Sequence, residues 1–533
     1  MGREVSLHPQ VVVEGDEQLF PFVHVSPLLP LRPAPRTNCT SLRGSTAGGR
    51  APLVIPCPRG RAVRSCRVSD TSPAAPALPT LSLASALRGL RREGLRADLL
   101  ESALDVDGLG ACSYLLADPL VLAAAEADEP LRLLAGPAAL ARALPADPLD
   151  AVDALLEATR PPDGRADPHL GFAGGAVLAL AYDLGRRYER IGSRARRDVP
   201  VPDVHAAIYS GGLAVPRGRT PRIVGRPSAR AREAFARLLA GGACPPPPFP
   251  PGTPPVLRAS SLDAEAYRDA VRSAQAAIRR GEVFEVNLSR RIDLDGVDPD
   301  ALYERLVALA PAPYMADLDL GDGRRLLSAS PERFLALSPD GRAESWPIKG
   351  TRRRGRSPAE DRALASELLG SEKDAAELAM IVDLVRNDLG RVAAPGSVRV
   401  RNPRRLQSWP TVHHTVAVVE ARLAPGRRWT DLVRAAFPPG SVTGAPKIRA
   451  MELIDRLEPV RRGLYCGAFG TVGWDGAVEL AVAIRVVVCA GGSAQVHSGG
   501  AVLLDSDPEA EEREACDKAR ALLAAARGGA RDA

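Results

Sequence analysis

The chain of 533 residues has few lysines, few aromatic residues and no long apolar run. No run approaches the roughly 18 apolar residues that a membrane helix needs, so we expect no membrane association. The N-terminal sequence lacks the apolar block and small-residue cleavage site of a signal peptide. The eight cysteines form neither a C-x-x-C pair nor a Cys/His zinc spacing. These absences indicate a soluble, reduced, cytoplasmic protein.

A strong excess of positive charge is also missing, because the net charge is only +6 over the whole chain. Basic clusters occur at residues 352–356 and 401–405. No stacking aromatic residues alternate with them, and acidic stretches follow nearby. We therefore expect these clusters to be solvated surface or to meet a small anionic ligand, and we expect no nucleic-acid partner.

Lysine is the scarcest basic residue. Of 70 lysines and arginines only four are lysine, at positions 349, 373, 447 and 518, which leaves 66 arginines. An amine can lose its proton and act as a nucleophile or base, whereas a guanidinium stays charged. A lysine that persists in such a chain therefore marks a candidate chemical site, although any single one can persist by chance. All four lie in the C-terminal part, so the chemistry is expected there.

Composition divides the chain into segments. Residues 1–80 are rich in proline and arginine and show no sustained period, which predicts a disordered extension. A proline-rich stretch at 241–256 predicts an extended linker between an N-terminal region, 81–240, and a catalytic domain, 257–525. The last residues, 526–533, are expected to form a disordered tail.

Helical and strand patterns are mixed without a strict βαβ period, which favours an α+β or mixed α/β fold. Helical spacing begins near Leu83 and continues through LASALRGLRREGLRADLLESAL. Residues 263–282 are expected to form a helix, and 283–294 and 324–337 are expected to form strands. A glycine-rich stretch at 171–189 lacks either phosphate-loop motif and is expected to serve close packing.

Lys349 lies between a proline and a glycine in WPIKGTRRRG. The backbone is therefore expected to be extended and then to turn, which projects the side chain. An amine attacks carbon only when unprotonated, and desolvation or neighbouring cations such as Arg352, Arg353 and Arg354 would lower its pKa. The alternative is an ordinary exposed loop lysine.

Two acidic helix starts carry carboxylates at i,i+3 spacing, Asp374 with Glu377 and Glu511 with Glu514. Each pair lies on one helical face. Four carboxylates on two facing helices would suit Mg²⁺, which prefers oxygen ligands. The alternative is that these acids only complement the helix dipole, and that Asp374 closes a capping box with Ser371.

Two further segments have side chains suited to binding. His413 and His414 precede an apparent strand, and since adjacent strand residues face opposite ways, at most one can serve a given site. The loop FPPGSVTGAPK leads into a helix, so Thr443 and the amides around Gly444 could bind an anion.

These segments, in this order, strongly resemble the chorismate-utilising enzymes, which include anthranilate, aminodeoxychorismate, isochorismate and salicylate synthases. The similar stretches are VFEVNLSRR, SASPERF, PIKGT, KDAAELAMIVDLVRNDLGRV, FPPGSVTGAPKIRAMELIDRLEP, RRGLYCGAFG, AVAIR and SDPEAE, which cover nearly all of residues 260–525. The N-terminal half matches more weakly. The resemblance implies a component-I-like fold, with β-sheets packed as a sandwich and flanked by helices.

The PIKGT motif resembles that of aminodeoxychorismate synthases, since anthranilate synthases typically read PIAGT there. The resemblance implies a transferase of the transaminase class that makes 4-amino-4-deoxychorismate for para-aminobenzoate and folate synthesis. Lys349 would attack C2 of chorismate and expel the C4 hydroxyl, and ammonia would then add at C4. Glu332, in SPERF, would be the general acid and base.

The same resemblance implies the remaining site. Glu377 and Glu514 would hold Mg²⁺, supported by Asp374 and Glu511. The substrate would be contacted by Gly350, Thr351, His414, Tyr465, Arg485, Gly499, Gly500 and Lys518. No G-x-C-x-G nucleophile of a glutamine amidotransferase is present, so a separate amidotransferase subunit would supply ammonia.

Some residues depart from the family pattern. Glu285 stands where isochorismate and salicylate synthases have a water-activating lysine, which disfavours water addition. Many relatives have glutamine there, so the role of Glu285 itself is open. Ala501 replaces the third glycine of a GGG motif. Pro313–Met315 and Ser102 resemble the tryptophan-binding residues of anthranilate synthase, which keeps that enzyme as the alternative. A non-catalytic binding subunit is the alternative from a second functional class.

Overall fold

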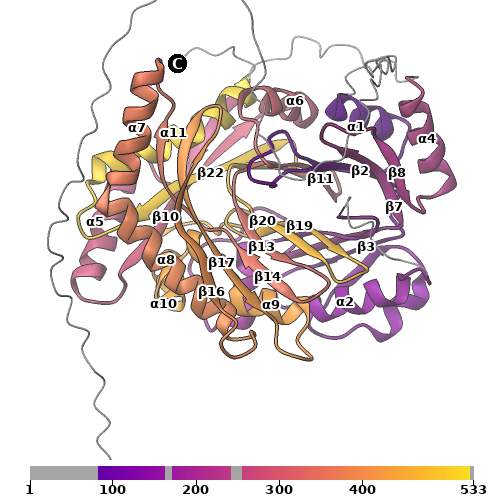
Figure 1. Cartoon of the computed structure of the whole chain (residues 1–533), viewed down its shortest axis with the longest axis horizontal. Helices are drawn as coiled ribbons and strands as arrows, with labels where there is room; N and C mark the ends of the chain where they lie inside the picture. The colour runs from indigo at the N-terminus through magenta and orange to yellow at the C-terminus, as the bar shows by residue number, and fades with distance from the viewer. Residues whose placement is uncertain (1–81, 163–170, 242–254, 528–533) are drawn as a thin grey trace, which may run out of the picture. The chain divides into compact units, whose positions relative to one another are not determined.

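Two large antiparallel sheets, each of 11 strands within the described residues, form the centre of the fold (Figure 1). The computed structural model describes residues 82–162, 171–241 and 255–527. Side chains from both sheets belong to one apolar core, so the sheets pack face to face. The predicted mixed α/β sandwich with flanking helices is confirmed.

The strands of each sheet are given in their order across it. The first sheet contains β18 (Gly444–Ala445), β10 (Glu285–Asp295), β22 (Ser493–Val502), β21 (Val486–Ala490), β12 (Arg324–Ser330), β11 (Tyr314–Gly321), β1 (Ala97–Glu101), β2 (Cys112–Ala117), β7 (Gly211–Pro216) and β8 (Arg222–Gly225), with β9 (Val256–Ser260) paired to β10. The second contains β15 (Ile348–Arg353), β17 (Val412–Arg422), β14 (Arg342–Ser345), β13 (Arg333–Leu337), β20 (Val478–Val482), β19 (Ala468–Gly473), β5 (Gly175–Leu180), β6 (Val204–Tyr209), β3 (Val121–Ala125) and β4 (Arg132–Ala135), with β16 (Arg399–Ser408) paired to β17.

Both halves of the sequence contribute strands to each sheet. In the first sheet β1 pairs with β11, and in the second β5 pairs with β19. The segment predicted to be an extension, 1–80, lies outside the described residues, as do most of the predicted linker and residues 528–533. Ala526 and Arg527, assigned to the tail, are the last residues of a helix.

Helices cover the outer faces of the sandwich. They are α1 (Leu83–Arg92), α2 (Pro148–Thr159), α3 (Gly185–Tyr188), α4 (Ala229–Leu239), α5 (Ala264–Arg279), α6 (Pro299–Leu309), α7 (Pro358–Gly370), α8 (Glu372–Gly390), α9 (Trp429–Ala436), α10 (Lys447–Leu457) and α11 (Pro508–Arg527), with short 3₁₀ turns at Ala138–Ala143, Tyr182–Leu184 and Gly440–Val442. Helices α1, α4, α6 and α11 pack on the first sheet, and α2, α8 and α9 on the second. Within the described ranges, none of these helices has the length and apolar character needed to span a bilayer.

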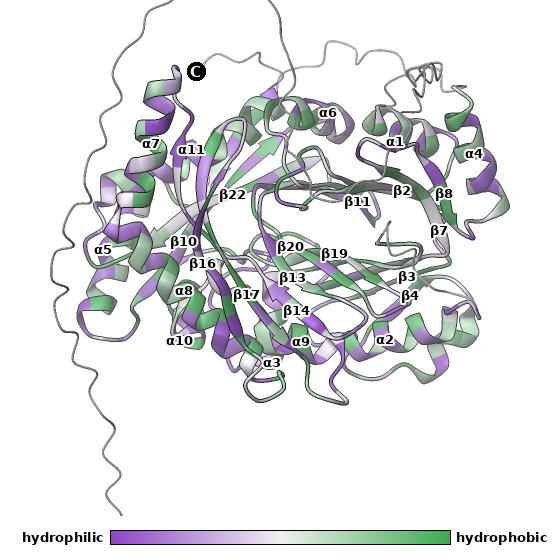
Figure 2. Cartoon of the chain, in the orientation of Figure 1, coloured by the Kyte–Doolittle hydropathy of each residue, from purple (hydrophilic) through white to green (hydrophobic). Residues whose placement is uncertain are grey.

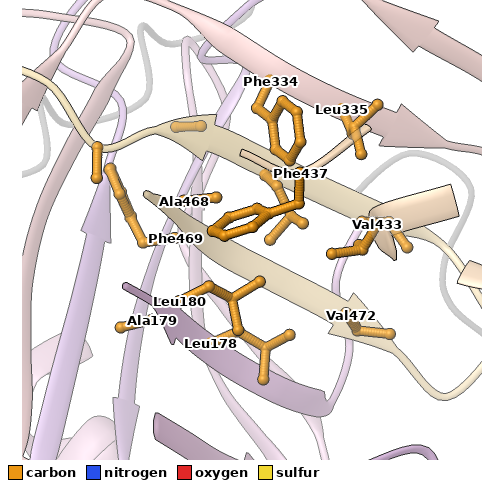
Figure 3. Close-up of a cluster of buried hydrophobic side chains, with 14 of the residues drawn as sticks. Leu178, Ala179, Leu180, Phe334, Leu335, Val433, Phe437, Ala468, Phe469 and Val472 are labelled. Atoms are coloured by element: carbon orange, nitrogen blue, oxygen red, sulfur yellow. The ribbon is translucent and has the colours of Figure 1, made fainter. Parts of the chain in front are cut away.

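Apolar side chains fill both faces of the central strands. On β12, Leu326 faces the core between the sheets and Leu327 faces the core under the helices, as alternation along a strand requires. Figure 2 shows the resulting hydrophobic colouring of β11, β2 and β19. Part of the core, with Phe334 and Phe437 edge to face at 6.1 Å, is drawn in Figure 3.

The sequence patterns located most elements but misplaced two. The helix expected at 263–282 is confirmed as α5, capped by Asp263. The strand expected at 324–337 is wrong as a single element, because Pro331 and Glu332 separate β12 from β13, which lie in different sheets. The helical spacing from Leu83 is also wrong beyond Arg92, since Gly94 turns the chain at φ 73° before β1 begins.

Close backbone approach joins the halves at Gly467, just before β19. A Cβ there would lie 2.9 Å from the Tyr182 amide nitrogen and closer still to the Leu180 carbonyl oxygen. We expect Gly467→Ala to lower the free energy of unfolding by about 1–3 kcal/mol, since the backbone of β5 must shift. Thermal or urea unfolding measures the loss.

Gly89 is the matched control, because a Cβ at this helical position would meet nothing within 4 Å. Gly89→Ala should stabilise the protein by about 0.5–1 kcal/mol through backbone entropy. Equal melting temperatures for the native protein and Gly467→Ala would contradict the proposed close packing.

Candidate active site

The bend in β15 places Lys349 at the edge of the second sheet. Pairing with β17 shifts register between Lys349 and Thr351, and Gly350 between them has φ 75°. A Cβ at Gly350 would lie 2.9 Å from Leu368 and 3.1 Å from Asp374. Only glycine fits this turn without strain. Lys349 itself is 8% exposed, so the alternative of an exposed loop lysine is wrong.

Two carboxylates hold the Lys349 ammonium. Its Nζ lies 2.7 Å from Glu285 Oε1, on β10, and 2.6 Å from Glu377 Oε1, on α8. Burial acts to lower the pKa of Lys349, but the two negative charges outweigh burial and raise it. The amine is therefore an ammonium in this state.

The expectation that neighbouring arginines lower this pKa is wrong. Each of the three pairs with an acid instead: Arg352 with Glu367 and Asp374, Arg353 with Glu360, and Arg354 with Asp361. Their charge is neutralised away from the lysine. A run of like charges in the sequence does not show which acids the fold will place beside it.

Glu332 lies in the break between β12 and β13, where the chain passes from one sheet to the other. It is 4% exposed, and burial raises its pKa to about 7. A hydrogen bond with the Ser441 side chain, the charge of Lys349 and the Ile348 amide act in the opposite direction. A carboxyl group with a pKa near neutrality can both donate and accept a proton at physiological pH.

The acids of α8 have arginine and lysine partners. Ser371 caps the helix by accepting from the Asp374 amide, as expected for that helix start. The Asp374 carboxylate accepts from Arg352 at 3.0 Å, while Glu377 contacts Lys349. Only part of the predicted capping box is therefore present.

The acids of α11 converge on the glycines of β22. A Cβ at Gly500 would lie 3.2 Å from Glu511 Oε2, 3.6 Å from Glu514 Oε1 and 3.6 Å from Lys518 Nζ. Lys518 Nζ lies 2.6 Å from Glu514 and donates to the Gly499 carbonyl at 3.1 Å. The absence of a side chain at Gly500 thus keeps space open beside three charged groups.

Gly499 and Glu511 have packing contacts. A Cβ at Gly499 would overlap the Leu288 carbonyl oxygen of β10, so this glycine allows two strands to approach closely. Glu511 Oε1 accepts from the Ser506 hydroxyl at 2.7 Å, and burial raises the pKa of Glu511. Its other oxygen is the one nearest Gly500.

The predicted metal ligands bring oxygen donors from two helices to one region. Lys373 on α8 interacts electrostatically with Glu511 and Glu514 on α11, which shows that the two helix starts lie near each other. Within the described residues, no three histidine, cysteine or acidic side chains form a metal-binding cluster on their own. A donor set of carboxylates fits a hard cation that takes its remaining ligands from water or substrate.

The two histidines of β17 face different partners, as predicted from strand alternation. His413 contacts Ser408 at 2.8 Å and Asp361 at 3.0 Å. His414 Nδ1 lies 2.8 Å from the Thr351 hydroxyl, and its Nε2 is buried with no hydrogen-bond partner in the part of the chain that the structure describes. Burial, assisted by the Arg485 charge, lowers the pKa of His414 to about 3, so its ring is neutral.

Arg485 is a cation with no acidic partner among the described residues. It adopts φ 51°, and within the described ranges no ion pair involves its guanidinium. Burial lowers its pKa. A buried charge is costly unless it is paired, so this guanidinium is suited to an anionic ligand.

Thr443 and Tyr465 are both buried and have partners within the protein. The Thr443 hydroxyl donates to the carbonyls of Pro439 and Gly440 at 3.3 and 3.2 Å, so it already has partners within its own loop. Tyr465 stacks on His497, with ring centroids 5.0 Å apart.

Arg462, which was not predicted from the sequence, connects the loop of Thr443 to the strand β10. Arg462 is fully buried and pairs with Glu458 at 2.7 Å. It donates to the carbonyls of Val442 at 2.9 Å and Asn287 at 2.6 Å. One arginine among 66 gives no signal in the sequence, because its importance comes from burial.

Comparison with known proteins identifies the family. The profile of the chorismate binding enzyme family matches residues 119–524. The chain belongs to this family. The match spans strands of both sheets and the candidate active-site residues from Glu285 to Lys518.

An aminodeoxychorismate synthase component and an anthranilate synthase component are nearly equally similar to this chain. Aminodeoxychorismate synthase component 1 of Salmonella typhimurium is 41% identical over 382 residues, covering 71% of this chain and 82% of that protein. Anthranilate synthase component 1 of Thermus thermophilus is 42% identical over 391 residues, covering 70% and 82%. The crystal structure of anthranilate synthase component I from Streptococcus pneumoniae superimposes with a TM-score of 0.67 at 29% identity, covering 78% of this chain and 92% of that one.

The raised pKa of Glu332 predicts a pH-dependent stability. Because its pKa rises from 4.5 to about 7 on folding, the native state binds this proton more tightly than the unfolded state. The stabilisation is fully present below pH 4.5 and is lost as pH rises through 7, a change of up to about 3 kcal/mol. Glu332→Gln keeps the shape but cannot titrate, so it should remove this loss.

Unfolding at a series of pH values checks this expectation. Relative to the native protein, Glu332→Gln should gain stability between pH 4.5 and 7 and then stay level. A difference between the two proteins that does not vary with pH would contradict the burial argument.

Proposed function

We propose that the chain is the chorismate-converting component of an aminodeoxychorismate synthase. The observation that carries the proposal is Lys349, a buried amine in contact with two carboxylates and in the electrostatic field of Glu332. The name of the Salmonella typhimurium relative supports this assignment. The product, 4-amino-4-deoxychorismate, would serve para-aminobenzoate and folate synthesis.

Two residues carry the chemical steps. The Lys349 amine attacks C2 of chorismate, the ring double bonds shift, and the C4–O bond breaks. Glu332 donates its proton to the departing hydroxyl, and its pKa near 7 suits this role. Ammonia then adds at C4, C2–N cleavage releases the lysine, and Glu332 accepts the proton from the new amine.

Chorismate is a dicarboxylate, and the site contains matching cations and donors. Arg485, which has no ion pair within the described residues, and Lys518 would bind carboxylates. Neutral His414, oriented by Thr351, presents its unpartnered Nε2 beside the ring. The remaining proposed contacts come from Gly350, Thr443, Tyr465, Gly499 and Gly500.

Mg²⁺ is the proposed cofactor, held by Glu377 and Glu514 with Asp374 and Glu511 in support. All four offer carboxylate oxygens, the donors that Mg²⁺ prefers. Bound there, the ion would neutralise negative charge next to the substrate carboxylate. Lys349 and Lys518, which now pair with Glu377 and Glu514, balance part of this charge.

A separate glutamine amidotransferase is the proposed source of ammonia. The sequence has no amidotransferase nucleophile motif, and the nearest resemblance is Cys466. Burial raises the pKa of that thiol to about 12, which leaves almost no thiolate at neutral pH. Cys466 is therefore unsuited to the role.

Anthranilate synthase remains the second candidate, because the Thermus thermophilus relative is as similar as the first. Ser102, Pro313, Tyr314 and Met315, which resemble its tryptophan-binding residues, line one cavity of about 680 Å³ between the sheets. This cavity does not distinguish between the two candidate functions, since some aminodeoxychorismate synthases also hold a structural tryptophan. Lys349 in the PIKGT motif favours the first candidate.

Product analysis with a matched lysine variant tests the function. With chorismate, Mg²⁺ and ammonia, we expect the native protein to make aminodeoxychorismate and no fluorescent anthranilate. Lys349→Arg keeps the charge but cannot present an unprotonated amine, so it should fail as badly as Lys349→Ala. Chromatography and fluorescence separate the products. Anthranilate formation would favour the second candidate, and an active Lys349→Arg protein would exclude covalent catalysis by Lys349.

Metal removal tests the cofactor. We expect EDTA to abolish turnover and Mg²⁺ to restore it. Glu377→Ala and Glu514→Ala should lower turnover by at least about 100-fold while the protein stays folded, because Glu514 is half exposed and Lys349 keeps Glu285 as a partner when Glu377 is removed. Full activity after rigorous chelation would leave these acids as helix-start residues.

A further inference from the structure

The first sheet and the loop before Tyr465 enclose a small polar recess. Side chains of β21 and β22 line it, together with residues 461–464 and the segment 197–203. Its volume of about 20 Å³ accommodates one molecule of the size of water or ammonia. Among the lining residues Asp198 is exposed, whereas Gln495 and His497 are only 5% and 7% exposed. The recess therefore reaches from the surface into the interior of the protein.

Two uncharged side chains of the recess have buried polar atoms that make no hydrogen bond within the described part of the chain. These atoms are Gln495 Oε1 and His497 Nδ1. Gln495 Nε2 donates to the Ser493 hydroxyl at 2.9 Å, which leaves the amide oxygen as an acceptor. Burial lowers the pKa of His497 well below its ordinary value, so its ring is neutral. Because a buried polar atom without a partner is costly, the pair indicates a small hydrogen-bonding ligand.

The charged side chains of the recess do not need that ligand, because all of them are in ion pairs. The pairs are Arg197 with Asp203, Asp198 with Arg291, Asp183 with Arg186 and Arg461, and Arg462 with Glu458. The arrangement therefore suits a neutral molecule rather than an ion. Ammonia can donate to the Gln495 oxygen, and it can donate to His497 Nδ1 or accept from it.

The buried part of the recess adjoins the proposed active site. The His497 ring stacks on Tyr465, with centroids 5.0 Å apart and planes 18° from parallel. Cys466, the next residue, interacts electrostatically with Glu332, the proposed acceptor of the ammonia proton. Gly499 follows two positions after His497, on the same face of β22. A molecule beside His497 is therefore next to Tyr465, a proposed substrate contact.

We propose that this recess is the entry site for ammonia, and that Gln495 and His497 bind it as neutral NH₃ before it adds at C4. The inference rests on the proposed function, in which ammonia is the second substrate and loses a proton to Glu332. It gives ammonia a binding place of its own, separate from the groups that contact chorismate.

His497→Phe is the direct test, because phenylalanine keeps a flat ring for Tyr465 but lacks both nitrogens. Turnover is measured with saturating chorismate and Mg²⁺ against the concentration of ammonium chloride at constant pH. We expect KM for ammonia to rise by at least about ten-fold, while KM for chorismate changes by less than about three-fold. Gln495→Leu, which removes the Oε1 acceptor at similar size, should shift KM for ammonia in the same direction.

A second readout uses the half of the reaction in which ammonia takes no part. The protein is incubated with chorismate and Mg²⁺ alone, and mass spectrometry follows the adduct on the peptide containing Lys349. Its rate of formation in both variants should stay within about two-fold of native, because only ammonia binding is changed. A displaced Tyr465 would alter this rate.

The matched control is His205→Phe. His205, on β6, is another buried histidine, and neither of its ring nitrogens has a hydrogen-bond partner among the described residues. It does not line the recess, so KM for ammonia should stay within about two-fold of native. If His497→Phe does not fold, the same two measurements on Gln495→Leu decide.

The outcomes separate this inference from the function on which it rests. An unchanged KM for ammonia in the variants overturns the proposal and leaves the recess as a site for water. A matching rise in KM for chorismate, or slower adduct formation, also overturns it, because His497 would then only support Tyr465. A native protein that makes no aminodeoxychorismate overturns the proposed function itself.

Discussion

The central constraint of this structure is a lysine ammonium buried between two carboxylates. Lys349 contacts Glu285 and Glu377 at 2.7 and 2.6 Å, and its pKa is raised by them despite burial. Charge in such a place is tolerated only when it is paired. The pairing keeps the amine protonated, so the three groups act as one chemical unit.

The fold brings these three residues together from separate elements. Glu285 belongs to the first sheet, Lys349 to the second and Glu377 to a helix that packs against the second, so the ion pair crosses the sandwich. Glu332 sits where the chain passes between the same two sheets. Because both sheets draw strands from the N-terminal and C-terminal regions, the geometry of the site depends on the whole sandwich.

Much of this was predictable from sequence, and the exceptions have physical reasons. Caps and turn residues located α5, α8 and α11, and motif resemblance selected Lys349 and Glu332. Local pattern failed at Pro331 and Glu332, since a continuous apolar run cannot show that a strand changes sheets. It also failed for the neighbours of Lys349. The adjacent arginines were expected to control its pKa, but Glu285 and Glu377, which are 64 and 28 positions away in the sequence, control it. Long-range pairs of this kind are fixed by topology, which a single sequence does not display.

The central claim is that Lys349 forms a covalent bond to the substrate ring. Its most direct test is mass spectrometry of the protein incubated with chorismate and Mg²⁺ but no ammonia, so that the second half of the reaction cannot occur. The account predicts that the peptide containing Lys349 gains the mass of chorismate less one water, and that the Lys349→Arg protein gains nothing. Quenched samples without an adduct, from a preparation that converts chorismate when ammonia is added, would contradict it.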